Sequence, residues 1–242
     1  MQNEVQLTFV VPLYNEAKNL DALQLRLLAL LNQLPEKVEV VLVDDGSTDE
    51  TPQRIYQLAL ADPRFLAVFL SRNHGHQLAI TAGLKIARGK EAVLILDGDL
   101  QDPPELVVAF LEKLRSGYEV VYGIRTNRKE AWYKRFSYYV FYRIMRQFGN
   151  IHLPADSGDF ALLSRKVVDY LNLLPEQNRY LRGMRAWIGF KQIGLPYERQ
   201  ERFAGHSKYN LKRLIELAYS GLFNFSSFPI KFITRLGVIT LA

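Results

Sequence analysis

The sequence predicts an α/β fold, a Rossmann-like and mostly parallel sheet with helices on both faces. Residues 1–123 contain five short apolar runs, four of them rich in Val, Ile and Leu without period-two alternation, as in strands buried on both faces. Helical patterns alternate with these runs, which favours parallel strands joined by helices. Polar residues follow the runs, where sheets of this kind bind ligands.

The predicted strands are the apolar runs themselves, Leu7–Leu13, Val38–Asp44, Phe65–Leu70, Ala92–Asp97 and Glu119–Gly123. Helical patterns fill the intervals, with an apolar face at Leu20, Leu23, Leu27, Leu30 and Leu31, and further helices at His76–Arg88 and Glu105–Ser116. Before the second helix, Ser47 and Glu50 have the spacing of a capping box.

The pattern changes after Gly123. We expect an aromatic-rich helix over 131–148, a short segment over 156–163, two helical stretches, a strand at Gln192–Tyr197 and a basic loop at Glu198–Tyr209. Residues 210–225 are amphipathic and fit either a core helix or a helix at a membrane interface. The apolar tail over 228–242 is shorter than the roughly 20 residues that span a bilayer, and we interpret it as the first part of a membrane helix.

Charge is divided unevenly along the 242 residues. Residues 1–122 carry 11 Lys and Arg against 17 Asp and Glu, whereas residues 123–242 carry 20 against 8. An acidic half suits a cation and a basic half suits phosphates, although a basic half is also compatible with a solvated surface. The absence of cysteine excludes disulfides and cysteine-ligated metals.

Polar residues gather at four of the predicted strand ends. The carboxyl ends of parallel strands meet at one edge of a sheet, so these segments together predict a site. The four segments are Pro12-Leu13-Tyr14-Asn15-Glu16, Asp44-Asp45-Gly46-Ser47, Ser71-Arg72-Asn73-His74-Gly75 and Asp97-Gly98-Asp99-Leu100-Gln101-Asp102.

The last of these segments predicts a metal site. Asp97 and Asp99 stand one residue apart after a strand, so both carboxylates can converge on one hard cation, Mg²⁺ or Mn²⁺, shared with substrate phosphates. Gly98 would let the backbone turn tightly, and Gln101 would add a neutral oxygen. An ordinary acidic turn is the alternative. An EF-hand fits poorly, because the loop lacks glycine at its sixth position and glutamate at its twelfth.

Two common nucleotide-binding motifs are absent from the chain, which narrows the kinds of nucleotide site that it can form. No GxGxxG follows the first strand and no GxxxxGK[ST] occurs, which disfavours dinucleotide enzymes and P-loop NTPases. Asp44 and Asp45 can then bind base or ribose hydroxyls, although Asp45 can equally cap the following helix. Arginine suits bidentate phosphate contacts, and the basic half offers Arg125, Arg128, Lys129, Arg135, Arg179, Arg182, Arg199, Arg202 and Lys208.

Several motifs together resemble glycosyltransferase family 2, and within it the polyprenyl-phosphate branch of dolichol-phosphate mannose synthase and bactoprenol glucosyltransferases. The resemblance covers nearly the whole chain. It rests on residues 11–16 (VPLYNE), 43–49 (VDDGSTD), 72–77 (RNHGHQ), 97–105 (DGDLQDPPE), 156–160 (DSGDF) and 202–209 (RFAGHSKY).

The resemblance implies a GT-A fold, inversion at the anomeric carbon and a site divided into four sets of residues. The metal and diphosphate ligands would be Asp97, Asp99 and Gln101. The donor pocket would add Pro12, Tyr14, Glu16, Asp44, Asp45, Asn73 and Gly98. Asp159 resembles the proposed catalytic carboxylate and would act with Asp99. The acceptor phosphate or donor diphosphate would meet Arg125, Arg135, Arg182, Arg202, Ser207 and Lys208.

The resemblance also implies the reaction. We expect transfer of a single sugar, with UDP-glucose as the first candidate donor and GDP-mannose as the second, to a polyprenyl phosphate at the cytoplasmic side of the cell membrane. Residues 1–123 would bind the donor, 124–209 the acceptor and 210–242 the membrane, with transmembrane helices expected beyond residue 242. The sequence leaves room for a homo-oligomer.

Three alternatives predict different behaviour. A GT-A enzyme with another acceptor would not depend on polyprenyl phosphate. A catalytically silent nucleotide-sugar-binding membrane module would bind donor and metal without transfer. A nucleic-acid-binding protein would show salt-dependent affinity for DNA or RNA, but the acidic first half and the apolar tail count against nucleic acid as a partner.

Overall fold

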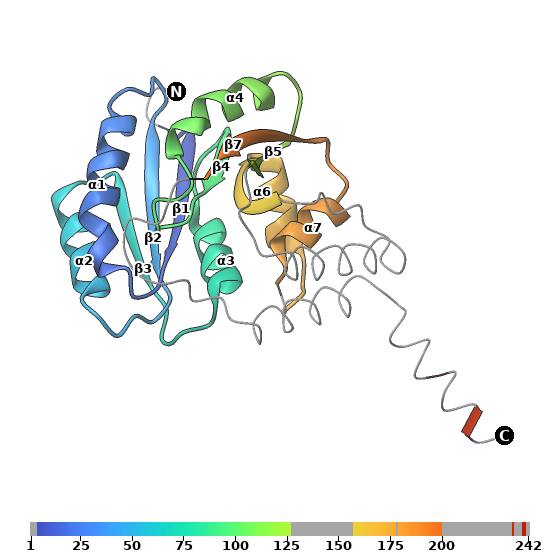
Figure 1. The fold of residues 1–242 in the computed structure, drawn as a ribbon, viewed down its shortest axis with the longest axis horizontal. Helices are drawn as coiled ribbons and strands as arrows, with labels where there is room; N and C mark the ends of the chain where they lie inside the picture. The colour runs from blue at the N-terminus through green and yellow to red at the C-terminus, as the bar shows by residue number, and fades with distance from the viewer. Residues whose placement is uncertain (1–3, 127–156, 178, 200–233, 235–238, 241–242) are drawn as a thin grey trace. The chain divides into compact units, whose positions relative to one another are not determined.

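The computed structural model describes residues 4–126, 157–177, 179–199, 234 and 239–240 (Figure 1). The chain divides into two compact units. One contains residues 1–127, 157–175 and 190–206, and it holds the sheet. The other contains residues 128–156, 176–189 and 207–242, and it includes helix α7 (Leu181–Trp187). The predicted helices over 131–148 and 210–225, the loop beyond residue 199 and most of the apolar tail lie outside the described residues.

Seven strands form one sheet in the order β3-β2-β1-β4-β6-β5-β7. Strand β1 pairs in parallel with β2 and β4, β2 with β3, and β5 with β7, whereas β6 runs antiparallel to both β4 and β5. The strands are β1 (Leu7–Leu13), β2 (Val38–Asp44), β3 (Phe65–Phe69), β4 (Ala92–Ile95), β5 (Val120–Thr126), β6 (Ser157–Ser164) and β7 (Gln192–Glu198).

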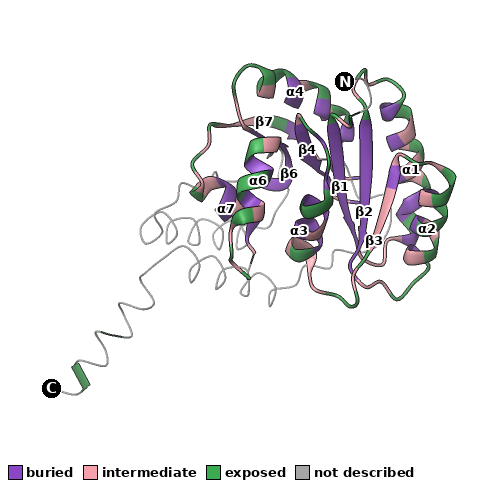
Figure 2. Cartoon of the chain, turned by 180° about the vertical axis from the view of Figure 1, so that it is seen from behind, coloured by how far each residue is buried: buried purple, intermediate pink, exposed green. Residues whose placement is uncertain are grey.

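The prediction of a mostly parallel sheet is confirmed, with one addition. Strands β1 and β2 have the predicted bounds, and β3, β4, β5 and β7 differ from theirs by at most a few residues. Strand β6 was expected only as a short segment. The central strands β1 and β2 are buried along their whole length, which explains their uninterrupted apolar sequences (Figure 2).

Helices cover both faces of the sheet, as predicted. On one face, α1 (Ala17–Leu31), α2 (Thr51–Ala61) and α4 (Val107–Arg115) share a core with alternate residues of β1, among them Phe9 and Val11. On the other face lie α3 (His76–Ile86) and α6 (Arg165–Leu173). Helix α3 packs closely on the sheet at Gly83, where a Cβ would collide with the side chain of Val10. Alternating side chains on one strand therefore serve two separate layers.

The short connections differ from expectation at two helix starts. The capping box expected at Ser47 and Glu50 is wrong, because Glu50 makes no side-chain capping bond. Ser47 Oγ instead accepts a hydrogen bond from the amide of Asn15 at 2.8 Å, and Asp49 accepts one from the amide of Thr51 at 2.9 Å. A single 3₁₀ turn, η1 (Pro104–Leu106), precedes α4. Within the described residues, no helix is long and apolar enough to cross a membrane.

Candidate active site

The reversed direction of β6 brings its amino end to the edge where β4 and β5 end. Ile95 of β4 pairs with Ala161 of β6. Asp97 follows the end of β4 by two residues, and Asp159 lies two residues before Ala161 in β6, so both lie near that pair at the same edge. Carboxylates that lie 62 positions apart in the sequence thus face one edge of one sheet. This is the edge at which parallel α/β sheets bind ligands.

Two side chains from the start of α3 lie against this carboxylate pair. His76 Nε2 is 3.4 Å from Asp97 Oδ1 and 3.6 Å from Asp159 Oδ2. Gln77 Nε2 donates a hydrogen bond of 3.0 Å to the same Asp159 oxygen. Asp159 is buried, and His76 and Asp97 are partly exposed, so the cluster lies at the boundary between core and solvent.

The electrostatics of this cluster favour bound cations. Burial raises the pKa of Asp97 to about 6, His76 opposes that rise, and the negative charges of Asp102, Asp99 and Asp159 add to it. Four carboxylates thus share one region of the sheet edge. A group whose pKa is raised in this way, at the carboxyl end of a strand, is typical of a functional site.

A second network joins the Asp97–Asp102 loop to β5 and β7. Asp102 is completely buried and accepts hydrogen bonds from the Tyr197 hydroxyl and, at 3.3 Å, from Arg199 Nε. Its other oxygen is 3.6 Å from Arg125 Nη2. Arg199 also reaches Asp99, with 3.8 Å between Nη2 and Oδ2. Two arginines are therefore held beside the acidic loop.

Burial and neighbouring charges shift the pKa of Arg125 in opposite directions. Burial alone would lower the pKa of Arg125, but Asp102 and Tyr197 outweigh it, and the pKa is raised. Burial and the neighbouring Asp102 carboxylate raise the pKa of Tyr197. Arg125 Nε donates to the Tyr197 hydroxyl at 3.3 Å, and a Cβ at Gly158 would come within 3.1 Å of the guanidinium. Glycine at position 158 thus provides the space that Arg125 occupies.

The ends of β1 and β2 form the side of the site predicted to bind the donor. Asp44 accepts a hydrogen bond from the amide of Ser47 at 3.2 Å. Asp45 accepts from the amides of His74 and Gly75 at 2.7 and 2.9 Å. Burial raises the pKa of Asp45, and these two amide bonds oppose that rise. Asp45 therefore holds the loop before α3 and does not cap α2, which was the alternative expected from the sequence.

Backbone geometry in the acidic loop differs from the expectation for Gly98. The positive φ in this loop belongs to Leu100, at 62°, a conformation that a leucine rarely adopts. Glycine is required at position 98 for space, since a Cβ there would collide with the buried side chain of Leu13. The Gln101 amide donates to Asp99 Oδ1 at 3.2 Å and closes the loop. Strain concentrated in one loop is characteristic of functional sites.

The residues present fit a divalent cation held jointly with a ligand. Asp97 Oδ1 is buried and accepts no hydrogen bond within the described part of the chain, and its ion-pair contact there is the 3.4 Å approach of His76 Nε2, so its capacity to accept is not used up. The described residues contain no group of three His, Cys, Asp or Glu side chains close enough to hold a metal alone. One or two carboxylates completed by substrate phosphates is a common arrangement for Mg²⁺.

The structure brings together only part of the predicted site. Asp97, Asp99, Asp159 and Arg125 lie at one edge of the sheet, and Gln101 closes their loop. Other predicted residues follow β1, β2 and β3 along the same edge: Pro12 is buried in β1, Tyr14 and Glu16 follow it, Asp44 and Asp45 follow one another at the end of β2, and Asn73 is exposed after β3. Arg182 belongs to α7 in the other unit. The remaining predicted phosphate-binding residues, Arg135, Arg202, Ser207 and Lys208, lie outside the described residues.

The set of site residues predicted from the sequence did not include five residues of these networks. Their roles depend on contacts between strands that are distant in the sequence, for example the 95 positions between Tyr197 and Asp102. Some signal was present, because two of the five belong to the RNHGHQ segment, a third belongs to the DGDLQDPPE segment, and a fourth was counted among the basic residues that suit phosphate. The five residues are His76, Gln77, Asp102, Tyr197 and Arg199.

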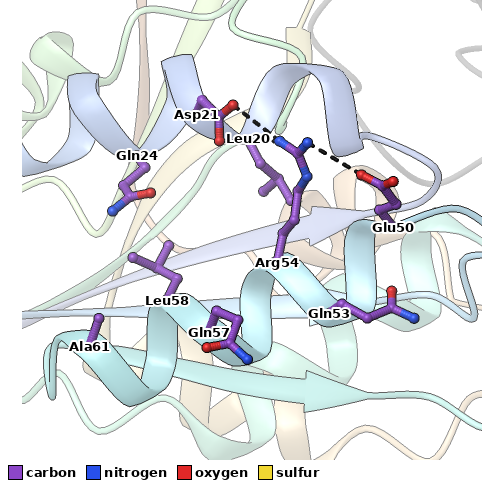
Figure 3. Close-up of a pocket in the computed structure, with 9 residues that line it drawn as sticks. All are labelled: Leu20, Asp21, Gln24, Glu50, Gln53, Arg54, Gln57, Leu58 and Ala61. Carbon is purple, nitrogen blue, oxygen red and sulfur yellow. Dashed lines mark hydrogen bonds and ion pairs between the residues drawn. The ribbon is translucent and has the colours of Figure 1, made fainter.

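A separate surface hollow of about 820 Å³ lies between α1 and α2 (Figure 3). Arg54 points into it and pairs with Asp21 and Glu50, whose carboxylates are 3.1 and 3.3 Å away. All three of these side chains are substantially exposed. None of the residues that line the hollow is among the predicted site residues, so its size alone does not identify it as the active site.

The comparisons with known proteins agree with this geometry. The family model described as glycosyl transferase family 2 matches residues 8–171, which include β1 to β6 and the whole acidic edge. The chain belongs to glycosyltransferase family 2. This glycosyltransferase is 42% identical over 240 residues to the uncharacterized glycosyltransferase YkcC of Bacillus subtilis, covering 99% of the chain and 74% of that relative.

Two further proteins are similar to this glycosyltransferase, one in sequence and one in fold. The bactoprenol glucosyl transferase of Shigella phage SfV is 35% identical over 235 residues, with 97% of the chain and 76% of that protein covered. A solved structure of the mannosyltransferase PcManGT from Pyrobaculum calidifontis, in complex with GDP-Man and Mn²⁺, matches with a TM-score of 0.55 at 22% identity, over 81% of this chain and 56% of the other. The sheet is therefore GT-A-like.

Proposed function

We propose that this glycosyltransferase transfers a single sugar from a nucleotide-sugar to a polyprenyl phosphate, with inversion, at the cytoplasmic face of the membrane. The proposal rests on one observation. The Asp97 and Asp99 carboxylates lie close to the Arg125 and Arg199 guanidinium groups at one edge of the sheet. The carboxylates suit a cation and a diphosphate, and the arginines suit a second anionic group.

On the donor side, Asp97, Asp99 and Gln101 would hold Mg²⁺ or Mn²⁺ together with the donor diphosphate. When bound, the cation would stabilise negative charge that develops on the departing nucleotide. Asp44 and Asp45 would bind the nucleoside, with Pro12, Tyr14, Glu16, Asn73 and Gly98 as further parts of that pocket. UDP-glucose is the preferred donor of this proposal and GDP-mannose the second candidate, because small changes in a pocket are sufficient to change donor preference.

On the acceptor side, the nucleophile is a phosphate oxygen that is already anionic, so it needs little help from a general base. That oxygen would form the new bond to C1 of the sugar as the bond from C1 to the diphosphate breaks and its electron pair leaves with the nucleotide. Arg125 would hold the acceptor phosphate in line with C1. Asp159 would orient the acceptor or the sugar and need not take a proton.

The lipid acceptor is supported by the sequence likeness to a protein named as a bactoprenol glucosyl transferase. A basic second half is the expected partner of a lipid phosphate and of an anionic membrane surface. Residues 124–209 would contribute to acceptor binding and residues 210–242 to membrane contact. Arg135, Arg182, Arg202, Ser207 and Lys208 complete the proposed set of phosphate contacts.

A matrix of donors and acceptors tests this function. Purified protein with Mn²⁺ is incubated with UDP-glucose, UDP-GlcNAc or GDP-mannose and with undecaprenyl phosphate in detergent, and lipid-linked sugar is measured by mass spectrometry. The proposal predicts one sugar per lipid phosphate, no product with undecaprenol and no product in EDTA. Transfer to a soluble sugar without any requirement for lipid phosphate would contradict the acceptor assignment. Metal-dependent donor binding without transfer to any acceptor would indicate a silent binding module.

A further inference from the structure

Gln77 has a contact that the proposed reaction does not yet use. It is the second residue of α3, and its side-chain Nε2 donates to Asp159 Oδ2 at 3.0 Å across 82 positions of sequence. It belongs to the RNHGHQ segment, which resembles the family pattern, but no role for Gln77 itself was predicted from the sequence. We propose that Gln77 is a positioning residue that fixes the orientation of the Asp159 carboxylate, an inference that rests on the proposed function.

The position of Gln77 is itself fixed by the loop before α3. Asp45 is buried and binds the amides of His74 and Gly75 at 2.7 and 2.9 Å, directly before the helix. Gly75 has φ of 96°, a backbone conformation that favours glycine. The Gln77 carbonyl also accepts a hydrogen bond from Thr81 Oγ1 at 2.8 Å. The start of α3 is therefore tied to β2, and the Gln77 side chain extends from a fixed backbone to β6.

The chemistry of an amide suits this task. The amide NH₂ group of glutamine only donates, and a carboxylate only accepts, so the bond has one direction and engages one named oxygen of Asp159. The amide is also neutral. It orients Asp159 without cancelling its negative charge, in a cluster where Asp97, Asp99 and Asp102 already lie nearby. A lysine or arginine at this position would orient the carboxylate but also neutralise it.

His76 does not provide an equivalent hold on Asp159. Its Nε2 lies 3.6 Å from Asp159 Oδ2 and 3.4 Å from Asp97 Oδ1, so it is shared between two carboxylates at ion-pair distances. The 3.0 Å bond from Gln77 is the shorter contact to Asp159 and has hydrogen-bond geometry. Of these two contacts, the hydrogen bond from Gln77 therefore defines the direction of the Asp159 carboxylate more closely than the contact from His76.

Two substitutions at Gln77 and one control test the inference. Gln77→Ala removes the donor, and Gln77→Glu keeps the shape but places a carboxylate against Asp159. The control is Gln57→Ala, an exposed glutamine on α2 that lines the distant surface hollow (Figure 3). We expect kcat for transfer to fall about 10- to 100-fold in Gln77→Ala, as for other residues that support a reacting group, and further in Gln77→Glu. The KM for donor and the melting temperature should stay near wild type, and Gln57→Ala should change none of these.

A double-mutant cycle and a crystal structure decide between positioning and mere structure. In an Asp159→Asn background, Gln77→Ala should add little further loss, because the two residues act as one unit. The crystal structure of Gln77→Ala should show the Asp159 carboxylate rotated. Unchanged kcat, a full additional loss in the Asp159→Asn background, or an unmoved Asp159 would overturn the inference. If wild-type protein transferred no sugar, the proposed function would fail, whereas the Asp159 orientation would still test the role of Gln77.

Discussion

At the residue scale, the carboxylates of the edge differ in the hydrogen bonds that they accept. Asp45 is bound by two backbone amides, at 2.7 and 2.9 Å. Asp97 Oδ1 accepts no hydrogen bond within the described residues and instead lies 3.4 Å from His76 Nε2. A buried acceptor without a hydrogen bond costs stability, roughly 1–3 kcal/mol. Asp45 therefore stabilises the loop before α3, whereas the raised pKa of Asp97 means that its charged form lowers the stability of the folded chain.

Without metal, the Asp97→Asn variant should accordingly become more stable relative to wild type as pH rises. The pKa of Asp97 is raised in the folded protein from 3.8 to about 6, so the folded state binds this proton more tightly than the unfolded state. The resulting stabilisation is complete below pH 3.8 and is lost as pH rises through about 6. Asparagine has no such loss. Urea unfolding in EDTA should show the variant gaining up to about 3 kcal/mol on wild type between pH 4 and pH 8.

Asp21→Asn is the matched control for this prediction. The Asp21 side chain is 81% exposed and retains its hydration, so its replacement should show no comparable gain with pH. A constant difference between Asp97→Asn and wild type across the pH range would show that Asp97 ionises as easily in the folded as in the unfolded chain. The prediction that the ionised Asp97 carboxylate lowers the unfolding free energy would then be wrong.

Sequence reasoning at this scale succeeded where local spacing carried the information. Asp97 and Asp99 stand one residue apart after an apolar run, and that spacing alone predicted a pair of carboxylates at a strand end. Asp102 follows three residues later but points into the core, where it meets Tyr197 of β7. Its role depends on which strand lies beside β5. No local pattern contains that information.

At the element scale, the polar residues at the two ends of the sheet are bonded differently. The carboxyl edge holds the acidic cluster. Near the opposite end of the same strands, Glu39 is buried and fully bonded, with Thr8 Oγ1 at 2.7 Å and Arg88 Nε at 2.6 Å. The Gly89 amide donates to Thr8 Oγ1 at 2.8 Å and completes this network. It ties β1 and β2 to the end of α3 and offers no unsatisfied atom to a ligand.

Arg88→Met should therefore reduce stability without reducing catalysis. The change leaves Glu39 Oε2 buried without its arginine partner, and the unfolding free energy should fall by about 1–3 kcal/mol. The methionine keeps the apolar stem of the arginine. Chemical denaturation and steady-state kinetics measured well below the melting temperature provide the two readouts. If kcat for sugar transfer fell substantially in the folded variant, the separation of a structural end from a catalytic end would be contradicted.

The elements themselves were predictable where hydrophobic runs were long. Strands β1 and β2 have the predicted bounds, because both are buried on both faces and their apolar residues run without interruption. Strand β6 contains Ser157, Gly158 and Asp159 at the site end, and these polar residues conceal its strand character. The capping box predicted before α2 was wrong for a related reason. Ser47 and Asp49 bond across to the β1–α1 connection, which a capping pattern within one segment cannot reveal.

At the scale of the whole molecule, the fold unites two halves of opposite charge. Residues 1–122 are acidic and residues 123–242 are basic, and the sequence could suggest only that one suits a cation and the other a phosphate. The larger compact unit takes residues from both halves. Within it, Arg125 and Arg199 of the basic half approach Asp102 and Asp99 of the acidic half. Basic residues of the second half and acidic residues of the first half therefore meet at this edge of the sheet.

Asp99→Asn tests most directly whether this edge of the sheet is the centre of metal-dependent sugar transfer. The measurement is the initial rate of lipid-linked sugar formation with saturating donor, Mn²⁺ and undecaprenyl phosphate, in wild type, Asp99→Asn and the Arg88→Met control. We predict a rate at least about 100-fold lower for Asp99→Asn with its melting temperature preserved, and a rate near wild type for Arg88→Met. A rate near wild type for Asp99→Asn would show that sugar transfer does not depend on this edge.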